Sequence, residues 1–538
     1  MKRKAELLST IFVKQYGIQP GDTVSLFSGN SVWYPVGVWA TIRAGGRVNG
    51  ASPAYNVDET VHALKTAKTK ILLTLPGSLD TARLAAKRVG IDGSRILLLE
   101  GQVDGVQSIQ TLIEHAEKEK IDVLPTWSIP KGTSNKDVCG YLNFSSGTTG
   151  LPKAVMLSHH NIIAQCYQLR QLQVLSKAEP PSTQLPHGLP EYRILAVMPL
   201  FHITGLVRFV SYPVFMNGLS VMLPQFTLPS MLESIINYKI EELILVPPIL
   251  IRLVQDPAVE PYLDDLRRTV KRWSSGSAPI APEVIKALQR KFPDTGFRQG
   301  YGATESTACI SAHPPSHFDY KYAHTGGKLV ANTIAKVVKL SSPTSEPDID
   351  GAETLLGPGE VGEICARGPQ IAMGYLGNEA ATRETFDKDG FLHTGDVGYV
   401  DEEGLIVISD RIKEMIKVRG QQVAPAELED LLLGHEEVED CAVIGVPDVY
   451  SGEIPKGYVV LRTRKSEGEV VGRKLMAYVK SKVVGYKRLR EIEFVEAVPK
   501  SPTGKLLRRV LKGWERGEDK TRRKGVVVKE EDKEKARL

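Results

Sequence analysis

The residues from Ser145 to Lys153 form the segment of the sequence best suited to chemistry. They read SSGTTGLPK, after the β-type run YLNF and before SHHNIIAQCYQ, which has a helical pattern. Glycines let backbone N–H groups approach an anion, hydroxyls donate further hydrogen bonds, and Lys153 adds positive charge. The pattern predicts a phosphate-binding loop between a strand and a helix. It differs from the GxxxxGK[ST] P-loop, because Leu-Pro separates Gly150 from Lys153 and no Ser or Thr follows the lysine.

Isolated charged and imidazole side chains elsewhere could complete such a site. Glu305 follows QGYGAT, and one carboxylate together with substrate phosphates is the usual arrangement for Mg²⁺. Asp396 stands in HTGD, His202 in MPLFHI and Lys505 in PTGK. Taken alone, Glu305 could cap a helix and Asp396 could serve a turn. His202 could pack in the core, and Lys505 could be a solvated charge.

These motifs together resemble the signature sequences of the adenylate-forming acyl-CoA synthetases. That superfamily includes 4-coumarate–CoA ligase, firefly luciferase and the adenylation domains of peptide synthetases. The resemblance runs from about Gly17 to Lys512, and the segment 391–429 is most similar to the coumarate-ligase and luciferase branch. The matching segments are SSGTTGLPKAVMLSHHNI, QGYGATES (299–306), GEICARGPQIAMGYLGN (362–378), FLHTGDVGYVDEEGLIVISDRIKEMIKVRGQQVAPAELE (391–429) and PKSPTGKLLRR (499–509).

The resemblance implies an ATP-dependent carboxylic acid–CoA ligase that works in two steps. ATP and a carboxylate give an acyl-adenylate and pyrophosphate, and CoA then takes the acyl group as a thioester and releases AMP. ATP and CoA are the implied co-substrates, and Mg²⁺ is the implied metal. The adenylate is a mixed anhydride that water would hydrolyse, so the site must close around it. A small C-terminal domain that rotates between the two steps is the implied means of closure.

The resemblance also implies roles for individual residues. Lys505 would act in the first half-reaction, Lys417 in the second, and His202 beside the acyl pocket and in thioester formation. Glu305 would hold Mg²⁺. The implied CoA-binding residues are Arg419 and Gly420. The implied ATP- and AMP-binding residues are Ser145, Ser146, Gly147, Thr148, Thr149, Lys153, Ala278, Gln299, Gly300, Tyr301, Thr304, Asp396, Arg411, Lys413 and Gln422.

Within this set the resemblance implies more specific contacts with the nucleotide. Tyr301 would stack on the adenine, and Asp396 would accept both ribose hydroxyls with Arg411 as its partner. Lys413 stands where the family has its hinge. The loop GSAP beginning at residue 276 would flank the nucleotide, and Ser277 replaces a glycine that is frequent in the family.

Strand-like and helix-like runs alternate from residue 18 to about residue 250, which predicts an α/β fold with a largely parallel sheet. We expect a large multi-layer α/β N-terminal domain with a β subdomain over 1–410. A small mobile α/β C-terminal domain should follow over 411–513, with its hinge near Lys413. The N-terminal domain looks shortened at its start relative to the family. The segment 514–538 is dominated by charges, which predicts a disordered tail.

The composition argues against several classes of protein. The 538 residues carry a net charge of only +5, without a basic stripe outside the extreme C-terminus, which argues against nucleic-acid binding. Five widely spaced cysteines without a CxxC argue against a disulfide scaffold or a structural zinc site and fit a reducing compartment. Polar residues interrupt the most apolar stretch, 194–223, so buried strands are expected there rather than a transmembrane helix. The N-terminus lacks the apolar core and cleavage site of a signal peptide.

The last residues, Ala536-Arg537-Leu538, resemble an SKL-type address. They predict a peroxisomal protein with the import receptor as a partner, with a cytoplasmic protein as the alternative. Other functions stay open: delivery of acyl groups to a carrier protein, a luciferase-like oxygenase, or an inactive truncated relative that only binds. The acid itself is not readable, although Thr204 stands near a tyrosine of coumarate ligases and leaves room for aliphatic or other aryl acids.

Overall fold

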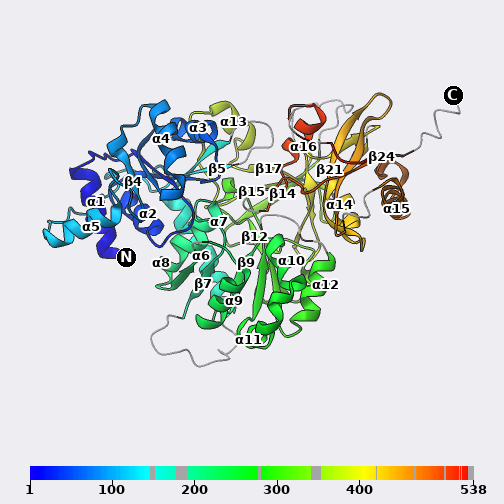
Figure 1. The fold of residues 1–538 in the computed structure, drawn as a ribbon, viewed down its shortest axis with the longest axis horizontal. Helices are drawn as coiled ribbons and strands as arrows, with labels where there is room; N and C mark the ends of the chain where they lie inside the picture. Colours follow the sequence, from blue (N-terminus) through cyan, green and yellow to red (C-terminus); the bar gives the residue numbers. More distant parts are fainter. Residues whose placement is uncertain are drawn as a thin grey trace.

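The structure is a computed structural model, shown in Figure 1, with the chain coloured from blue at the N-terminus to red at the C-terminus. It describes residues 1–145, 152–176, 191–223, 225–276, 280, 282–340, 353–419, 421–463, 468–501, 504–519, 522 and 524–530. Helices and strands alternate along most of this part of the chain, as predicted, so the α/β class is confirmed.

The first sheet has seven strands, and its central strands run parallel. Every residue of its strand Thr23–Phe27 is buried, as expected for a parallel strand covered on both faces. Across the sheet the strands are β16 (Gly374–Tyr375), β6 (Lys153–Ser158), β5 (Cys139–Ser145), β2 (Arg47–Ala51), β1 (Thr23–Phe27), β3 (Thr69–Thr74) and β4 (Ile96–Leu98). Its helices are α1 (Lys2–Lys14), α2 (Tyr34–Arg43), α3 (Val57–Ala67), α4 (Leu79–Val89), α5 (Ile109–Lys118) and α6 (His159–Ser176).

The second sheet has five strands, of which β9, β10 and β11 are parallel. Across the sheet they are β13 (Lys328–Leu329), β12 (Ser311–Ala312), β11 (Gly296–Tyr301), β10 (Arg272–Ser275) and β9 (Glu242–Leu245). Its helices are α9 (Leu228–Asn237), α10 (Pro247–Gln255), α11 (Leu263–Thr269) and α12 (Pro282–Lys291). This sheet and the first sheet share one apolar core, in which Trp273 and Phe297 are fully buried.

The apolar stretch 194–223 is only partly strand, which corrects the prediction. Strands β7 (Arg193–Ala196) and β8 (Leu219–Met222) lie at its ends and pair in parallel. Between them the chain is helical: α7 (Ile203–Gly205), a π-helical turn (Leu206–Ser211) and α8 (Tyr212–Phe215). Parallel strands require a crossover connection, and this helical segment supplies it. Among the described residues, no helix has both the length and the apolar character needed to cross a bilayer.

The third sheet is antiparallel and contains the predicted hairpin. Its strands are β14 (Ile334–Val338), β15 (Gly362–Arg367), β17 (Leu392–Val400) and β18 (Ile406–Arg411), and helix α13 (Glu379–Thr385) lies before β17. Asp401 and Gly404 form the turn between β17 and β18, as the sequence predicts.

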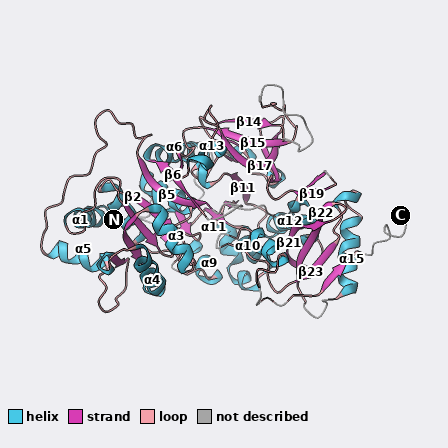
Figure 2. Cartoon of the chain, turned by 90° about the horizontal axis from the view of Figure 1, so that it is seen from above, coloured by secondary structure: helices cyan, strands magenta, loops and turns pink. Residues whose placement is uncertain are grey.

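The fourth sheet has its own apolar core and lies at the end of the molecule away from the first sheet, as Figures 1 and 2 show. Its strands are β20 (Gln421–Val423), β19 (Ile416–Val418), β22 (Gly452–Leu461), β23 (Glu491–Phe494) and β24 (Val527–Lys529), and β21 (Val438–Asp448) also pairs with β22. Its helices are α14 (Pro425–Leu433), α15 (Glu469–Lys480) and α16 (Arg508–Glu515). The separate core is compatible with the predicted small domain, whose boundaries stay a prediction.

The predicted disorder of 514–538 is wrong for part of that segment. Strand β24 pairs with β23 in antiparallel fashion, and Val528 is buried in the core of the fourth sheet. Arg522 forms an ion pair with Glu493, whose side chain is fully buried. Composition alone overlooked this strand, because the segment buries one apolar side chain and gives its charges specific partners on β23. Residues 531–538, with the predicted peroxisomal address, lie outside the described residues.

Candidate active site

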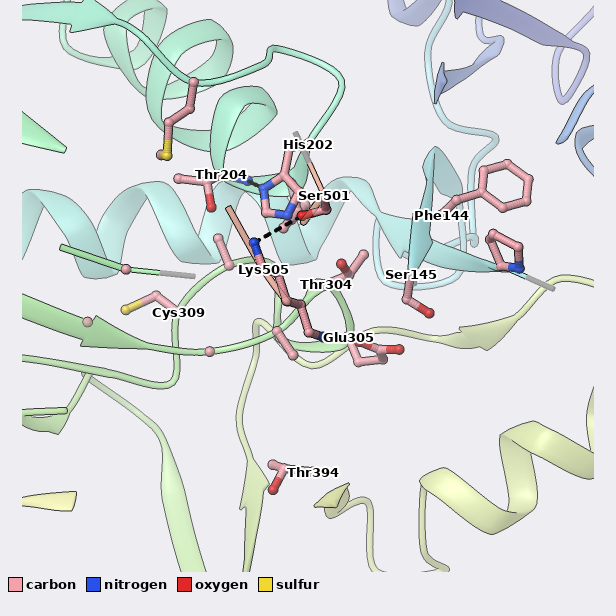
Figure 3. Close-up of a pocket in the computed structure, with 18 of the residues that line it drawn as sticks. Phe144, Ser145, His202, Thr204, Thr304, Glu305, Cys309, Thr394, Ser501 and Lys505 are labelled. Atoms are coloured by element: carbon pink, nitrogen blue, oxygen red, sulfur yellow. Dashed lines mark hydrogen bonds between the residues drawn. The ribbon is translucent and has the colours of Figure 1, made fainter. Parts of the chain in front are cut away.

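A cavity of about 740 Å³ has walls from the first three sheets and from a hairpin at residues 500–507. Figure 3 shows His202, Ser501, Lys505 and Glu305, which come from different segments, grouped near the centre of the view. Ligands of parallel α/β sheets usually bind beyond the carboxyl ends of the strands, where Gly276 and Gly302 follow β10 and β11. The predicted residues that line this cavity are Ser145, Lys153, His202, Gly300, Thr304, Glu305, Arg411, Lys413 and Lys505.

Lys505 enters the cavity on a short hairpin of the C-terminal part of the chain. The N–H of Ser501 donates to the carbonyl oxygen of Lys505 over 2.8 Å, and the N–H of Lys505 donates to Ser501 Oγ over 3.1 Å. Gly504 has φ +77°, in the left-handed region that glycine adopts at little cost. A Cβ at Gly504 would lie 3.0 Å from Cγ of Pro248 on α10, so the hairpin is in close contact with the second sheet's layer.

The charge of Lys505 is sensitive to its surroundings. Burial, and next the guanidinium of Arg411, lower the pKa of Lys505 to about 8. The carboxylates of Glu414, Asp396 and Glu305 act in the opposite direction. In Figure 3, Lys505 lies between His202 and Glu305. An ammonium in this position is available to an anionic substrate in the cavity.

Glu305 is held by a tyrosine that the sequence analysis missed. The hydroxyl of Tyr375 donates a hydrogen bond to Glu305 Oε1 over 2.8 Å, and Lys153 Nζ lies 4.9 Å from the centre of the same ring. Tyr375 is on β16, which pairs with β6 directly after Lys153. One aromatic side chain therefore links the end of the predicted phosphate loop to the predicted metal carboxylate.

The loop after Tyr301 is tightly folded. Thr307 and Ala308 have φ values of 51° and 86°, an uncommon conformation for residues other than glycine. A Cβ on Gly302 would come 2.3 Å from the carbonyl oxygen of Ala308, and Ser306 Oγ accepts the N–H of Ala303. Backbone in such strained conformations is held by the surrounding structure and is found most often at functional sites, where it fixes the position of a side chain. Here the fixed side chain is that of Glu305.

His202 is neutral and has a defined proton position. Burial, and then the nearby Lys505 ammonium, lower the pKa of His202 to about 4. Its Nδ1 accepts the N–H of Thr204 over 3.3 Å at the start of α7. The proton of the neutral ring is therefore on Nε2, which can donate to an oxygen in the cavity.

Asp396 lies just behind the cavity wall rather than in it. Its Oδ1 forms an ion pair with Arg411, with Nε 2.9 Å away, and its Oδ2 accepts a hydrogen bond from the hydroxyl of Tyr301 over 2.8 Å. Asp396 and Arg411 are direct partners across β17 and β18. A carboxylate has about four acceptor sites, so the Tyr301 hydrogen bond and the Arg411 ion pair leave capacity for two further hydroxyls. Gln299 likewise adjoins the lining without belonging to it.

The turn that carries Asp396 is held by a second carboxylate that the sequence analysis did not single out. Glu363 Oε1 accepts the N–H of Gly395 over 2.9 Å, and its Oε2 accepts from Nδ1 of His393 over 3.0 Å. This hydrogen bond to Glu363 raises the pKa of His393. Glu363 and His393 both line the cavity. The motifs GEICARG and HTGD contain these residues, but sequence alone does not show that their side chains meet.

Three predicted residues of the second half-reaction lie outside the cavity. Lys417 and Gln422 are direct partners in the hairpin of β19 and β20, and Arg419 is at its turn. All three side chains are exposed. The structure therefore places the hairpin that carries them away from the group around Lys505.

Part of the predicted site falls outside the described residues: Ser146, Gly147, Thr148, Thr149, Ala278 and Gly420. The segment 146–151 joins two strands that pair in antiparallel fashion, with Ser145 opposite Lys153. This corrects the predicted strand–loop–helix arrangement, since helix α6 begins only after β6. Lys153 thus starts a strand, and strand pairing fixes its backbone.

The chain matches two protein-family models. The model described as AMP-binding enzyme matches residues 1–376, and the model described as AMP-binding enzyme C-terminal domain matches residues 427–505. The peroxisomal OPC-8:0-CoA ligase 1 of Arabidopsis thaliana is 35% identical over 501 residues, covering 93% of this chain and 85% of that protein. The probable 4-coumarate–CoA ligase 1 of Dictyostelium discoideum is 36% identical over 519 residues, covering 93% and 87%.

Solved structures share the fold over nearly the whole chain. The crystal structure of the ATP-bound RpMatB-BxBclM chimera B1 has a TM-score of 0.80 at 26% identity, covering 96% of this chain and 92% of that one.

Proposed function

This chain belongs to the AMP-binding enzyme family, and we propose that it works as an ATP-dependent carboxylic acid–CoA ligase. The reaction forms an acyl-adenylate and pyrophosphate, and then an acyl-CoA thioester and AMP. The observation that carries the proposal is the position of Lys505. A distant hairpin brings its ammonium into the cavity that also contains Glu305 and His202.

In the first half-reaction a carboxylate oxygen attacks the α-phosphorus of ATP and pyrophosphate leaves. Negative charge builds up on the phosphoryl oxygens, so a positioned ammonium stabilises the transition state more than the ground state. Lys505 supplies this ammonium. His202 donates from Nε2 to the carboxylate and orients the attacking oxygen. The ribose hydroxyls donate to Asp396, whose orientation is already fixed by the ion pair with Arg411 and the hydrogen bond from Tyr301.

Mg²⁺ fits this donor set. A hard cation requires oxygen ligands, and one carboxylate together with phosphate oxygens is its usual environment at nucleotides. Glu305 presents such a carboxylate to the cavity, with Tyr375 holding Oε1. When bound, the ion would neutralise charge on the triphosphate. The predicted loop of Ser145 to Thr149 and Lys153 would bind the phosphates beside it.

For the second half-reaction we propose a rotation about Lys413, which would remove Lys505 and bring the hairpin of β19 and β20 to the site. The exposed Lys417, Arg419 and Gln422 would then face the adenylate, with Gly420 near the pantetheine of CoA. Lys413 lines the cavity and lies between β18 of the third sheet and β19 of the fourth. A short segment between separately packed cores suits such a rigid-body change.

The decisive experiment measures AMP, acyl-adenylate and acyl-CoA by mass spectrometry from purified protein, Mg-ATP and pooled carboxylic acids, with and without CoA. The ligase predicts acyl-CoA that requires CoA. Adenylate without any thioester would favour delivery to a carrier protein instead. No product from a folded sample would contradict the proposal and favour a protein that only binds.

We also propose that the chain is peroxisomal. Residues 536–538 resemble an import address, and the Arabidopsis relative is named as a peroxisomal ligase. An N-terminal fluorescent fusion should coincide with a peroxisomal marker, and deletion of residues 536–538 should return it to the cytoplasm. A diffuse signal from the full chain would contradict the proposal.

A further inference from the structure

One side of the cavity contains an unusual group of charges. Beyond His202 and Thr204, away from the phosphate-loop side, the wall includes Arg208, Glu242 and Arg298. Cys309, which lies on this side in Figure 3, is close enough to Arg298 and Arg208 for both guanidinium charges to affect its thiol. A pocket built only for an alkyl or phenyl chain would have no use for charges here, because unpaired buried charges are costly.

Glu242 is fully engaged by other groups. Its Oε1 accepts from Nη1 of Arg298 over 2.9 Å and from Ser274 Oγ over 3.3 Å, and its Oε2 lies 3.5 Å from Nη2 of Arg272. Burial acts to raise the pKa of Glu242, but Arg298 and Arg272, and after them Arg208, keep it at about 2, so the carboxylate is charged. Two arginines therefore already exceed the charge of the one carboxylate.

Arg208 is a third arginine in the same place. Among the described residues it forms no hydrogen bond or ion pair, and its Nε is buried without an acceptor. The guanidinium carbon lies 5.7 Å from the centre of the Tyr212 ring. Within the part of the chain that the structure describes, the hydroxyls of Tyr192 and Tyr212 are also buried without a hydrogen-bond partner, and both lie within electrostatic reach of Arg208.

The backbone that carries Arg208 is itself specialised. It belongs to the π-helical turn Leu206–Ser211, in which Ser211 Oγ donates to the carbonyl oxygen of Leu206 over 2.9 Å. π-Helical turns are rare and occur frequently at functional sites. This turn follows directly on α7, which His202 caps. The same short segment therefore carries both His202 and Arg208.

We propose that the acid substrate carries a second carboxylate at the end remote from the one that is activated, and that Arg208 binds it. The inference rests on the proposed ligase function and specifies its substrate class. Three guanidiniums against one carboxylate leave two uncompensated charges, and a second carboxylate would supply acceptors for Arg208. The reacting carboxylate would remain at His202 and Lys505.

The test compares three series of acids of equal chain length: α,ω-dicarboxylic acids, unsubstituted monocarboxylic acids, and monocarboxylic acids with a terminal methyl ketone. AMP formation gives kcat/KM for each acid over a range of chain lengths. A lost charged hydrogen bond corresponds to about a 10–100-fold effect. We expect the best dicarboxylic acid to exceed its monocarboxylic counterpart by at least that factor. An equal rate with the ketone series would overturn the inference, because a neutral acceptor would then suffice.

Two variants separate recognition from folding. Arg208→Met should reduce the dicarboxylic-to-monocarboxylic ratio of kcat/KM by about 10–100-fold, and Arg208→Lys should retain part of the preference. Arg268→Met, at an exposed arginine of α11, should leave the ratio unchanged. A ratio near one in the wild-type enzyme, or one that Arg208→Met does not alter, would overturn the inference while the ligase function stands. If none of the acids supported AMP formation, the result would instead contradict the proposed function, and this inference with it.

Discussion

The lowered pKa of Lys505 makes the first half-reaction sensitive to alkaline pH. With a pKa of about 8, roughly nine tenths of the ammonium is protonated at pH 7 and roughly one tenth at pH 9. Only the protonated form stabilises the developing phosphoryl charge. The rate of the first half-reaction should therefore fall as the pH rises. We expect kcat/KM for ATP to fall about tenfold between pH 7 and pH 9.

The assay should isolate this step from thioester formation. Pyrophosphate release without CoA, with both Mg-ATP and acid subsaturating, reports the titration of the enzyme before either substrate binds. Lys505→Arg keeps its charge throughout this range, because a guanidinium does not lose its proton there. This variant should be slower at pH 7 but lack the alkaline decline. Lys286→Arg, at an exposed lysine of α12, should retain the wild-type profile.

Two results would refute the reasoning. An alkaline decline of the same size in Lys505→Arg would assign the titration to another group. A rate in Lys505→Ala equal to that of the wild type would remove Lys505 from the mechanism altogether. We expect that variant to lose adenylation by about 10²–10³-fold, the usual effect of removing one preorganised electrostatic contact.

Three further substitutions test the surroundings of the site. Tyr375→Phe removes the hydroxyl that donates to Glu305. It should raise the Mg²⁺ concentration that gives half-maximal pyrophosphate release by about 10-fold. An unchanged dependence on Mg²⁺ would contradict the role of the tyrosine. Asp396→Asn should lower kcat/KM for ATP by about 10–100-fold, and equal loss with 2′-deoxy-ATP and ATP would argue against contact with the ribose. Arg508→Ala removes the guanidinium whose Nη2 donates to both carboxylate oxygens of buried Glu429. In denaturant titrations it should reduce the free energy of unfolding of the fourth-sheet region by about 3–5 kcal/mol. Arg516→Ala, in an exposed ion pair, should change this free energy little.

Sequence reasoning named nine of the residues that line the cavity, because the order and spacing of the motifs could be read directly. Lys505 and Glu305 are 200 residues apart, yet both line one cavity as expected. Sequence reasoning missed side chains whose role depends on contact with a residue far away in the sequence. Tyr375 matters only because β16 pairs beside Lys153, and Arg208 looked like an interruption in an apolar run.

Local pattern also failed where strand pairing decides the structure. The segment before residue 152 was expected to lead into a helix, but Ser145 and Lys153 face each other in two antiparallel strands. Counting charges in 514–538 gave no hint of β24, because burial of Val528 and pairing with β23 are contacts between distant segments.

Because Gly504 lies in close contact with Pro248, a substitution at this position would change how often the chain has Lys505 in the cavity. A methyl group at Gly504 would meet Pro248 and would also be strained at φ +77°. Both costs apply to the arrangement with Lys505 in the cavity, and an arrangement with this hairpin withdrawn would escape at least the tight contact with Pro248. Gly504→Ala would thus shorten the dwell time of one state without altering any group that touches the reacting atoms. The relative rates of the two half-reactions would then change through a residue that does not contact the reacting atoms.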